Sequence, residues 1–178
     1  MPVPRILASH ELTGFQIEAL RRLMDRAFQG RFDDHDWDHA LGGVHVVVEE
    51  DGTPLAHGAL IERRLRVDGR TLRTGYVEAV AADPDRQGLG MGTAVMEVIG
   101  GLIRERFEIG GLGTGSQGFY ERLGWRIWTG ATAVVGPEGL RRTPDEDGYV
   151  MVLLTGATDD LDTTTGTLIA DWREGDVW

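Results

Sequence analysis

The sequence predicts an α/β (α+β) fold organised around a mixed sheet. Three segments rich in β-formers, His45–Glu50, Pro54–Val67 and Arg73–Ala82, follow one another and are separated by the turn signals Asp51-Gly52 and Asp68-Gly69. Helical and extended patterns alternate along the chain after them. Hairpin-connected strands followed by strands separated by helices indicate a sheet with both antiparallel and parallel neighbours.

Two helices are predicted before the first of these strands. Residues 16–28 carry apolar side chains at the three- and four-residue spacing of a helix. Residues 33–40 favour a short second helix, with Asp33 or Asp34 as its N-cap. The pair Gly42-Gly43 that follows ends this helix.

Beyond the third strand, a helix begins at Gly90 and the remaining elements are shorter. We expect strands at residues 107–114, 124–135 and 149–154, a short helix at 116–122, a loop at 136–147 and a polar tail with weak periodicity. No repeat or low-complexity linker interrupts the pattern, so we predict a single domain over residues 1–178.

The charge of the chain disfavours some functions. Acidic residues outnumber basic ones 29 to 18, and the formal net charge is −11. Such a field attracts cations and repels phosphate backbones, which predicts no nucleic-acid partner. The acidic excess is concentrated in residues 33–38 and 143–178; solubility is the alternative explanation for it.

The chain contains neither cysteine nor lysine. This excludes disulfides, cysteine nucleophiles, Schiff-base chemistry and the phosphate-binding lysine of Walker motifs. His35 and His39 have the spacing of two metal ligands on a helix, but no third ligand accompanies them, so we predict no metal. The N-terminal apolar run is too short for a signal peptide and no segment approaches a membrane span, which predicts a cytoplasmic protein without membrane contact.

The segment Gly75–Thr93 combines a carboxylate with a glycine-rich loop. An apolar strand carrying Glu78 leads into Asp83-Pro84 and then into Gln87-Gly88-Leu89-Gly90-Met91-Gly92, which opens a helix. Glycine backbone N–H groups at a helix N-terminus can converge on phosphate oxygens. Apolar neighbours of Glu78 are expected to raise the pKa of its carboxyl toward that of a general base, while a solvent-exposed sheet edge is the structural alternative.

This loop resembles the acetyl-CoA pyrophosphate loop of the GNAT-type N-acetyltransferases, whose pattern is Gln/Arg-x-x-Gly-x-Gly/Ala. The segment Phe119–Trp125, with Tyr120 on a short helix, is similar to the second landmark of that superfamily. The resemblance implies a GNAT fold, with a mixed, mostly antiparallel central sheet flanked by helices, and acetyl-CoA as acetyl donor. The implied cofactor-binding residues are Val80, Ala81, Ala82, Gln87, Gly88, Leu89, Gly90, Met91, Gly92 and Thr93.

Four further segments narrow the family. The chain is similar, over almost its whole length, to the aminoglycoside 2′-N-acetyltransferases. The segments that carry this similarity are residues 37–45 (with Leu-Gly-Gly-x-His), 75–78, 142–145 and the terminal Asp-Trp-Arg-x-Gly-Asp-x-Trp. The similarity implies acetyl transfer to the 2′-amine of an aminoglycoside, by direct attack in a ternary complex. It also implies a homodimer and a role in antibiotic resistance. The acidic charge agrees, because an aminoglycoside is a polycation.

The family resemblance also implies roles for individual residues. Glu78 is the implied base, a backbone N–H at Val80 or a neighbour receives the oxyanion, and Tyr120 donates a proton to the thiolate. A bulge in the strand of Glu78 is implied to separate it from the strand at 107–114. The catalytic residues that the resemblance implies are Glu78, Tyr120 and Trp178. The substrate-binding residues that it implies are Asp36, Glu78, Ala79, Gly113, Asp145, Glu146, Asp176 and Trp178.

The sequence departs from the family pattern at Arg31, which replaces an acidic residue of some relatives, at Gln87, which replaces arginine, and at the shortened segment 113–116. Arg31 changes an expected contact to a substrate amine, Gln87 weakens a charge contact to a cofactor phosphate, and segment 113–116 alters local cofactor and substrate contacts. Two alternatives remain open: a GNAT enzyme acting on another polyamine or amino sugar, and a CoA- or aminoglycoside-binding protein with impaired catalysis. Core packing without a chemical role is the alternative for Tyr120 and for the Trp178 tail.

Overall fold

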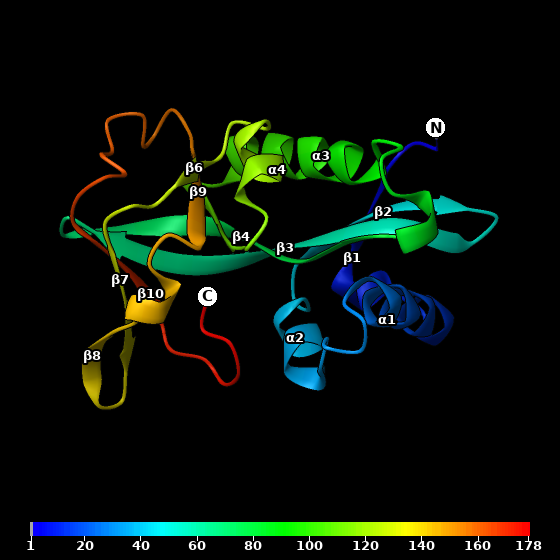
Figure 1. The fold of residues 1–178 in the computed structure, drawn as a ribbon, viewed down its shortest axis with the longest axis horizontal. Helices are drawn as coiled ribbons and strands as arrows, with labels where there is room; N and C mark the ends of the chain where they lie inside the picture. Colours follow the sequence, from blue (N-terminus) through cyan, green and yellow to red (C-terminus); the bar gives the residue numbers. More distant parts are fainter. Residues whose placement is uncertain (1) are drawn as a thin grey trace. The chain divides into compact units, whose positions relative to one another are not determined.

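The computed structural model describes residues 2–178, which form two compact units. The first unit extends to Ile61 and includes Val77–Gly101, and the second consists of Glu62–Tyr76 and Leu102–Trp178. Strands β3 (Thr53–Val67) and β4 (Arg70–Ala82) and helix α3 (Met91–Arg106) each contribute to both units (Figure 1). The expectation of a single domain stays a prediction.

In the first unit, helices cover both faces of an antiparallel ladder. Its other elements are β1 (Arg5–Ala8), η1 (Ser9–Glu11), α1 (Gly14–Ala27), α2 (Asp34–His39), β2 (Val44–Glu50) and η2 (Pro84–Arg86). Strand β2 pairs with β1 on one side and with the first half of β3 on the other. Leu20 and Trp37 pack with Val47, whereas Gly58 lies close under Val95 and Ile99 of α3. α1 and α2 therefore lie on one face and the start of α3 on the other (Figure 1).

The local signals in the sequence account for these elements. Thr13 caps α1 and Asp33 caps α2, each in a capping box with the residue three positions later. Asp51 and Gly52 have φ of 50° and 75°, and Asp68-Gly69 is similar, as type I′ hairpin turns require. The predicted helices and the three-strand meander are confirmed to within a few residues. Across residues 2–178, no helix is both long and apolar enough to cross a membrane.

The second unit is built on a mixed sheet. Its remaining elements are β5 (Ile109–Gly113), α4 (Gln117–Glu121), β6 (Arg126–Ile127), β7 (Ala131–Gly136), β8 (Gly139–Arg142), η3 (Pro144–Glu146), β9 (Val150–Leu154) and β10 (Thr167–Asp171). The strand order is β6-β9-β5-β4-β3-β10-β7-β8. β4 with β5 and β7 with β10 are parallel, and the other pairs whose register is known are antiparallel. The predicted mixed, mostly antiparallel sheet with flanking helices is confirmed.

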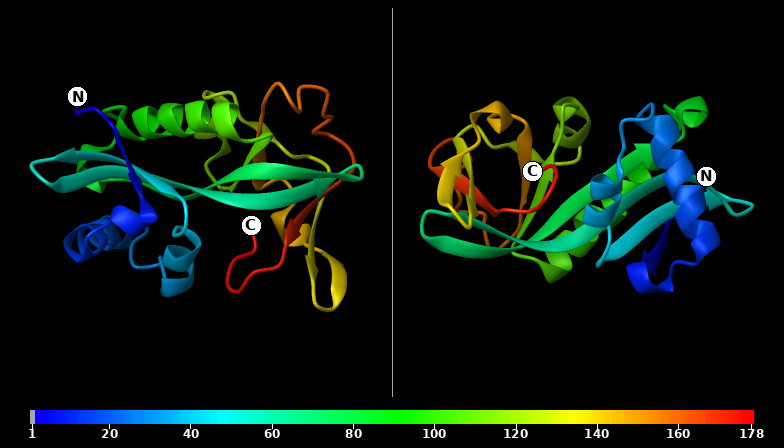
Figure 2. Two further views of the ribbon diagram at one scale, coloured as in Figure 1. Left: turned by 180° about the vertical axis from the view of Figure 1, so that it is seen from behind. Right: turned by 90° about the horizontal axis from the view of Figure 1, so that it is seen from below.

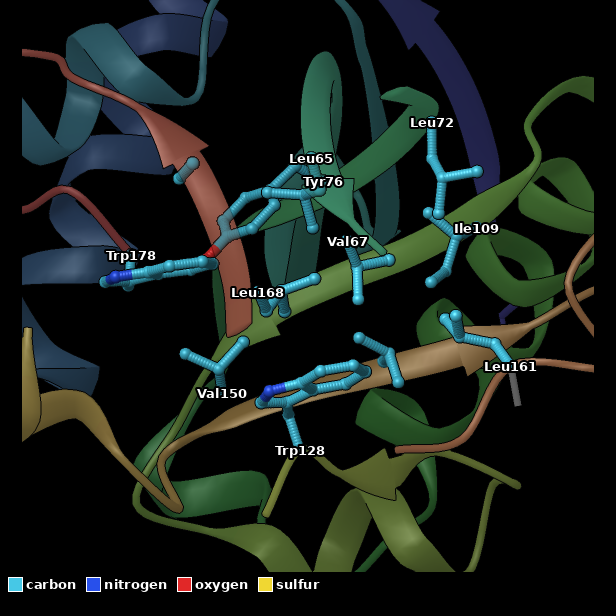
Figure 3. Close-up of a cluster of buried hydrophobic side chains, with 12 residues drawn as sticks. Leu65, Val67, Leu72, Tyr76, Ile109, Trp128, Val150, Leu161, Leu168 and Trp178 are labelled. Carbon is cyan, nitrogen blue, oxygen red and sulfur yellow. The ribbon is translucent and has the colours of Figure 1, made fainter. Parts of the chain in front are cut away.

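The core of the second unit is a cluster of buried side chains from the sheet and from the chain end (Figure 3). Its members are Leu65, Val67, Leu72, Tyr76, Ile109, Trp128, Val150, Val152, Leu161, Leu168, Ala170 and Trp178. The last residues loop back from β10 toward this cluster, so the C-terminus is packed rather than free (Figure 2).

The structure corrects several predicted elements. The single strand expected at 124–135 is two strands, because β6 pairs with β9 whereas β7 pairs with β10 and β8, and the chain crosses between them at Trp128–Gly130. The loop expected at 136–147 contains β8, whose side chains are all exposed and so show no alternation. Strand β10 in the polar tail and β1 near the N-terminus were also not predicted, because each lies in a weakly patterned segment and is defined by its pairing with distant strands.

Candidate active site

Glu78, the predicted base, lies in β4 of the first unit, where the strand becomes irregular. The next residue, Ala79, has a φ of 51°, in the left-handed region that residues with a Cβ seldom adopt. Glu78, Ala79 and Val80 are all half-buried, although side chains of a regular strand point alternately to two faces. The irregularity brings Glu78 and the peptide that follows it to a partly accessible surface, and the bulge implied for this strand stays a prediction.

Two buried histidines hold this irregular backbone. His57 of β3 contacts the Ala79 carbonyl oxygen through Nδ1 at 2.8 Å, and its Nε2 lies 2.8 Å from Nδ1 of His45 in β2. Both side chains are fully buried. Burial lowers the pKa of His45 to about 4, and burial together with the neighbouring His45 lowers the pKa of His57 to about 3. Both imidazoles are therefore neutral at pH 7.

The histidine pair predicts a loss of stability in mild acid. In the unfolded chain each histidine takes up a proton near pH 6.5, whereas the folded protein resists protonation down to about pH 4. The contribution of each histidine to the free energy of unfolding is therefore fully present above pH 6.5. Below pH 6.5 it falls by about 1.4 kcal/mol per pH unit for each histidine. Urea unfolding at pH 7 and pH 5 measures this loss, and His45→Gln is expected to reduce it by about 2 kcal/mol. An equal loss in the variant would contradict the assignment.

The glycine-rich loop connects η2 to α3 and is exposed. Gly88 and Gly90 have φ of 79° and 80°, and a Cβ at either would meet no atom within 4 Å. These glycines therefore serve the backbone conformation and not close packing. The loop ends where α3 begins, at Met91, so the first N–H groups of the helix face outward without acceptors inside the helix. This geometry is suited to an anionic group.

The base of the loop is anchored to helix α1. Both carboxylate oxygens of Asp83 accept hydrogen bonds from Arg26, at 3.0 and 2.9 Å, and Arg26 also reaches Asp85 at 2.8 Å. The Asp83 N–H donates to the Leu55 carbonyl at 2.8 Å. Asp83 is buried, so this bidentate pair fixes the direction in which the chain leaves β4.

Asp36, a predicted substrate ligand, closes the N-terminus of α2. Its carboxylate accepts the Asp33 N–H at 2.9 Å, and its own N–H donates to the Asp33 carboxylate at 3.0 Å. The helix cap therefore holds this half-exposed acid in a defined place. Arg31, nearby in the chain, donates from Nε to the Phe28 carbonyl oxygen at 3.2 Å.

Tyr120, the predicted acid, lies on α4 in the second unit. Its ring contacts Phe119 and Trp125 edge to face, and Gly124, with a φ of 88°, turns the chain so that the Trp125 N–H bonds to the Tyr120 carbonyl. Burial raises the pKa of the Tyr120 hydroxyl to about 12. Tyr120 is therefore protonated at any ordinary pH. It can donate a hydrogen bond to a thiolate, but full proton transfer is uphill because a thiol is the stronger acid.

The chain end is fixed in the second unit. The Trp178 indole is buried, and its N–H donates to the Thr143 hydroxyl at 3.1 Å. A Cβ on Gly113, at the end of β5, would lie 3.1 Å from the terminal carboxyl carbon of Trp178. The terminal carboxylate therefore lies against a strand end that is open only because residue 113 is glycine.

Two arginines hold the tail through its backbone. Arg63 donates to the carbonyl oxygens of Val177 at 2.8 Å and Asp171 at 3.0 Å, and Arg173 donates to that of Asp176 at 2.8 Å. Both guanidinium groups lie over the ring of Tyr76, at 4.6 and 5.6 Å from its centroid. The tail is thus held by charged donors stacked on a buried aromatic ring.

Carboxylates gather beside this tail. The pKa of Glu146 is raised by burial and by the negative charges of Asp176 and Asp145. A chain of hydrogen bonds links the Trp178 indole through Thr143 and Thr132 to Asp147, so the loop of Glu146 and the tail of Asp176 are held together. Like charges held close in this way favour a bound cation.

The structure divides the predicted site residues between the two units. The first unit contains Asp36, Glu78, Ala79, Val80, Ala81, Ala82, Gln87, Gly88, Leu89, Gly90, Met91, Gly92 and Thr93. The second contains Gly113, Tyr120, Asp145, Glu146, Asp176 and Trp178. Within the second unit, Gly113 lies against Trp178, and the charges of Asp145 and Asp176 act on Glu146.

Sequence reasoning missed the supporting roles of His57, Arg26 and Arg63. It noted His45, the partner of His57, only as the histidine of the Leu-Gly-Gly-x-His segment. His57 interrupts the apolar first half of β3, and that was a usable signal because an unpaired histidine is costly in a core. The arginines gave no signal, because their partners are 57 residues or more away in the chain.

Comparison with known proteins gives consistent matches. Residues 9–128 match the model of the acetyltransferase (GNAT) domain. The chain is 41% identical over 178 residues to a protein of Mycolicibacterium fortuitum described as an aminoglycoside 2′-N-acetyltransferase, covering 98% of this chain and 91% of that one.

Solved structures share the fold. A GNAT family N-acetyltransferase from Escherichia coli, determined in complex with CoA, superposes with a TM-score of 0.66 at 17% identity, over 96% of this chain and 91% of the other. A GCN5-related N-acetyltransferase from Kribbella flavida gives a TM-score of 0.59 at 20% identity over 70% of this chain. The present chain spans only 33% of the length of that protein.

Proposed function

Because this chain belongs to the GNAT acetyltransferases, and within them to the aminoglycoside 2′-N-acetyltransferase family, we propose that it transfers acetyl from acetyl-CoA to the 2′-amino group of an aminoglycoside. It is an acyltransferase acting by direct attack of the amine in a ternary complex. The amine nitrogen bonds to the acetyl carbon, the carbon–sulfur bond breaks, and the amine proton passes to a base.

The acidic cluster of the second unit carries the substrate assignment. Glu146, Asp176 and the Trp178 carboxylate belong to one packed region, where Glu146 is already destabilised as an anion by its neighbours. Ammonium groups of a polycationic amino sugar would relieve that repulsion. Asp145 in the second unit and Asp36 and the Ala79 backbone in the first are further proposed contacts to the substrate.

The proposed binding site for the acetyl donor lies in the first unit. Backbone N–H groups of Gln87–Gly92 and the first turn of α3 suit the pyrophosphate of acetyl-CoA, while Val80, Ala81 and Ala82 offer backbone groups to its pantetheine arm. Gly88 and Gly90 themselves present no side chain to the bound group. No lysine or arginine of the loop is needed, because the helix dipole and the N–H groups favour the anion.

Each step of the transfer has a proposed residue. Glu78 takes a proton from the substrate ammonium, directly or through water, so that the neutral amine can attack. The Val80 N–H stabilises the oxyanion that forms at the thioester carbonyl. Tyr120, protonated throughout, donates a hydrogen bond to the leaving thiolate. A homodimer, a cytoplasmic location and a role in aminoglycoside resistance complete the proposal, supported by family resemblance alone.

The position of acetylation is tested with two substrates that differ at one carbon. Tobramycin carries a 2′-amine and kanamycin A a 2′-hydroxyl. We expect CoA thiol release with tobramycin and a rate at least about 100-fold lower with kanamycin A, since a site built for one polar group discriminates strongly against its replacement. Mass spectrometry of the product locates the acetyl group. N-acetylation of both at equal rates would refute the 2′ assignment, and binding without thiol release would favour an impaired enzyme.

A further inference from the structure

Three side chains of the first unit, the partly buried Ser9 and two buried histidines, form a line of hydrogen bonds that the proposed chemistry does not use. It begins at Ser9, whose Oγ lies 2.9 Å from Nε2 of His45, continues from His45 Nδ1 to His57 Nε2 at 2.8 Å, and ends at the Ala79 carbonyl oxygen, 2.8 Å from His57 Nδ1. The Gly42 N–H donates to the Ser9 Oγ at 3.0 Å. The line thus runs from the glycine turn before β2 to the backbone beside Glu78.

The direction of every hydrogen bond in this line follows from its two ends. A carbonyl oxygen only accepts, so His57 carries its proton on Nδ1. A neutral His57 then accepts at Nε2, which places the proton of His45 on Nδ1 as well. Nε2 of His45 in turn accepts from the Ser9 hydroxyl, which donates to it at 2.9 Å in preference to the Gly43 carbonyl oxygen at 3.2 Å, and the Ser9 oxygen receives the Gly42 N–H. One arrangement of protons satisfies all four contacts, with both histidines as Nδ1–H tautomers.

The last acceptor belongs to the peptide that matters most for the reaction. The Ala79 carbonyl and the Val80 N–H are the two ends of one peptide group, and in a planar trans peptide they point in opposite directions. A bond that holds the carbonyl therefore fixes the direction of the N–H. Ala79 itself is strained, with a φ of 51°, and such a conformation persists only where its surroundings hold it. Donation to the carbonyl also strengthens the N–H as a donor.

We propose that His57 is a positioning residue that fixes the Val80 N–H as oxyanion donor, and that His45 and Ser9 hold His57 in the tautomer this requires. The inference rests on the proposed acetyl transfer, because that reaction gives the Val80 N–H its role. His57 touches neither substrate and acts through the Ala79–Val80 peptide. A purely structural pair would stabilise the fold without acting selectively on turnover.

A matched pair of variants separates these roles. In His57→Asn the side-chain NH₂ occupies the place of Nδ1 and can still reach the Ala79 carbonyl, whereas in His57→Gln the amide lies one carbon further out, near the place of Nε2. We expect His57→Gln to lose about 10- to 100-fold in kcat, approaching the loss of an oxyanion donor, with KM changed less than about threefold. His57→Asn is expected to keep kcat within about threefold of the wild type.

The outcomes are distinguishable. Equal kcat in the Asn and Gln variants, or a loss confined to KM, would overturn the positioning role. A wild-type enzyme that acetylates no aminoglycoside would instead refute the proposed function.

Long-range ¹H–¹⁵N NMR of the unmodified protein reads the tautomers without any reaction, and finding Nε2–H on either histidine overturns the proton order. If His57→Gln does not fold, Ser9→Ala serves: the Ala79 carbonyl still sets both histidines as Nδ1–H tautomers, whereas the lost donor to His45 Nε2 loosens the line and is expected to lower kcat with KM little changed. An unchanged kcat in Ser9→Ala would count against the proposal.

Discussion

Glu78→Gln is expected to lower kcat by about 10²- to 10⁴-fold at neutral pH, the range typical for a lost general base. Glutamine keeps the size and hydrogen-bonding reach of the side chain but accepts no proton at these pH values. The half-buried position of residue 78 next to strained Ala79 tolerates the exchange, so the fold is expected to be retained. Steady-state kinetics by thiol release measure the effect.

The pH dependence of this variant identifies the cause. At low pH the amine substrate is an ammonium ion and cannot attack without a base, whereas at high pH part of it is already the free amine. The deficit of Glu78→Gln is therefore expected to be largest at low pH and to shrink as the pH rises. Glu97→Gln, at an exposed position of α3, is the control and should behave as the wild type. A pH–rate profile unchanged in shape would remove Glu78 as the base.

The sequence was informative where one residue or a short segment determines a structure. Asp51-Gly52 and Asp68-Gly69 form the hairpin turns predicted, because few residues adopt positive φ at two successive positions. The glycine-rich loop was recognisable for the same reason: Gly88 and Gly90 are needed for their backbone conformation.

Elements that depend on distant partners could not be predicted. Strand β8 has no buried side chain, and β10 exists because β7 and β3 offer their edges to a weakly patterned segment. The strain at Ala79 is likewise invisible in the sequence, since alanine gives no sign of a positive φ. It becomes intelligible only when His57, 22 residues earlier, is seen to hold its carbonyl.

The same limit applies to the carboxylates. The sequence indicated that Asp145, Glu146 and Asp176 are acidic groups available to a polycation, but solubility explained them equally well. The structure adds the hydrogen bonds of Thr143 and Thr132, which join the loop of Glu146 to the tail and support the proposal of a shared binding role. Asp145 and Asp176 are exposed, and their negative charges raise the pKa of the half-buried Glu146.

One glycine added after Trp178 is expected to lower kcat/KM for the aminoglycoside by about 10- to 100-fold while leaving the thermal midpoint nearly unchanged, as for loss of one partner of a charge pair. The addition keeps the buried indole and its bond to Thr143 but replaces the carboxylate beside Gly113 by a neutral peptide. The charge moves outward by one residue. Deleting Trp178 would be less informative, because it also empties a place in the core.

Arg63, which holds the tail, provides a second test of the terminal carboxylate, and Arg64 provides its control. Arg63→Gln removes the charged donor to the Val177 and Asp171 carbonyls and should lower kcat/KM in the same direction, because the carboxylate is then poorly placed. Arg64→Gln, the exposed neighbour on β3, should have no effect. If both act through the same carboxylate, combining Arg63→Gln with the added glycine costs little more than the glycine alone, since residues acting as one unit are not additive. Fully additive losses would show that Arg63 acts on something other than the position of the terminal carboxylate.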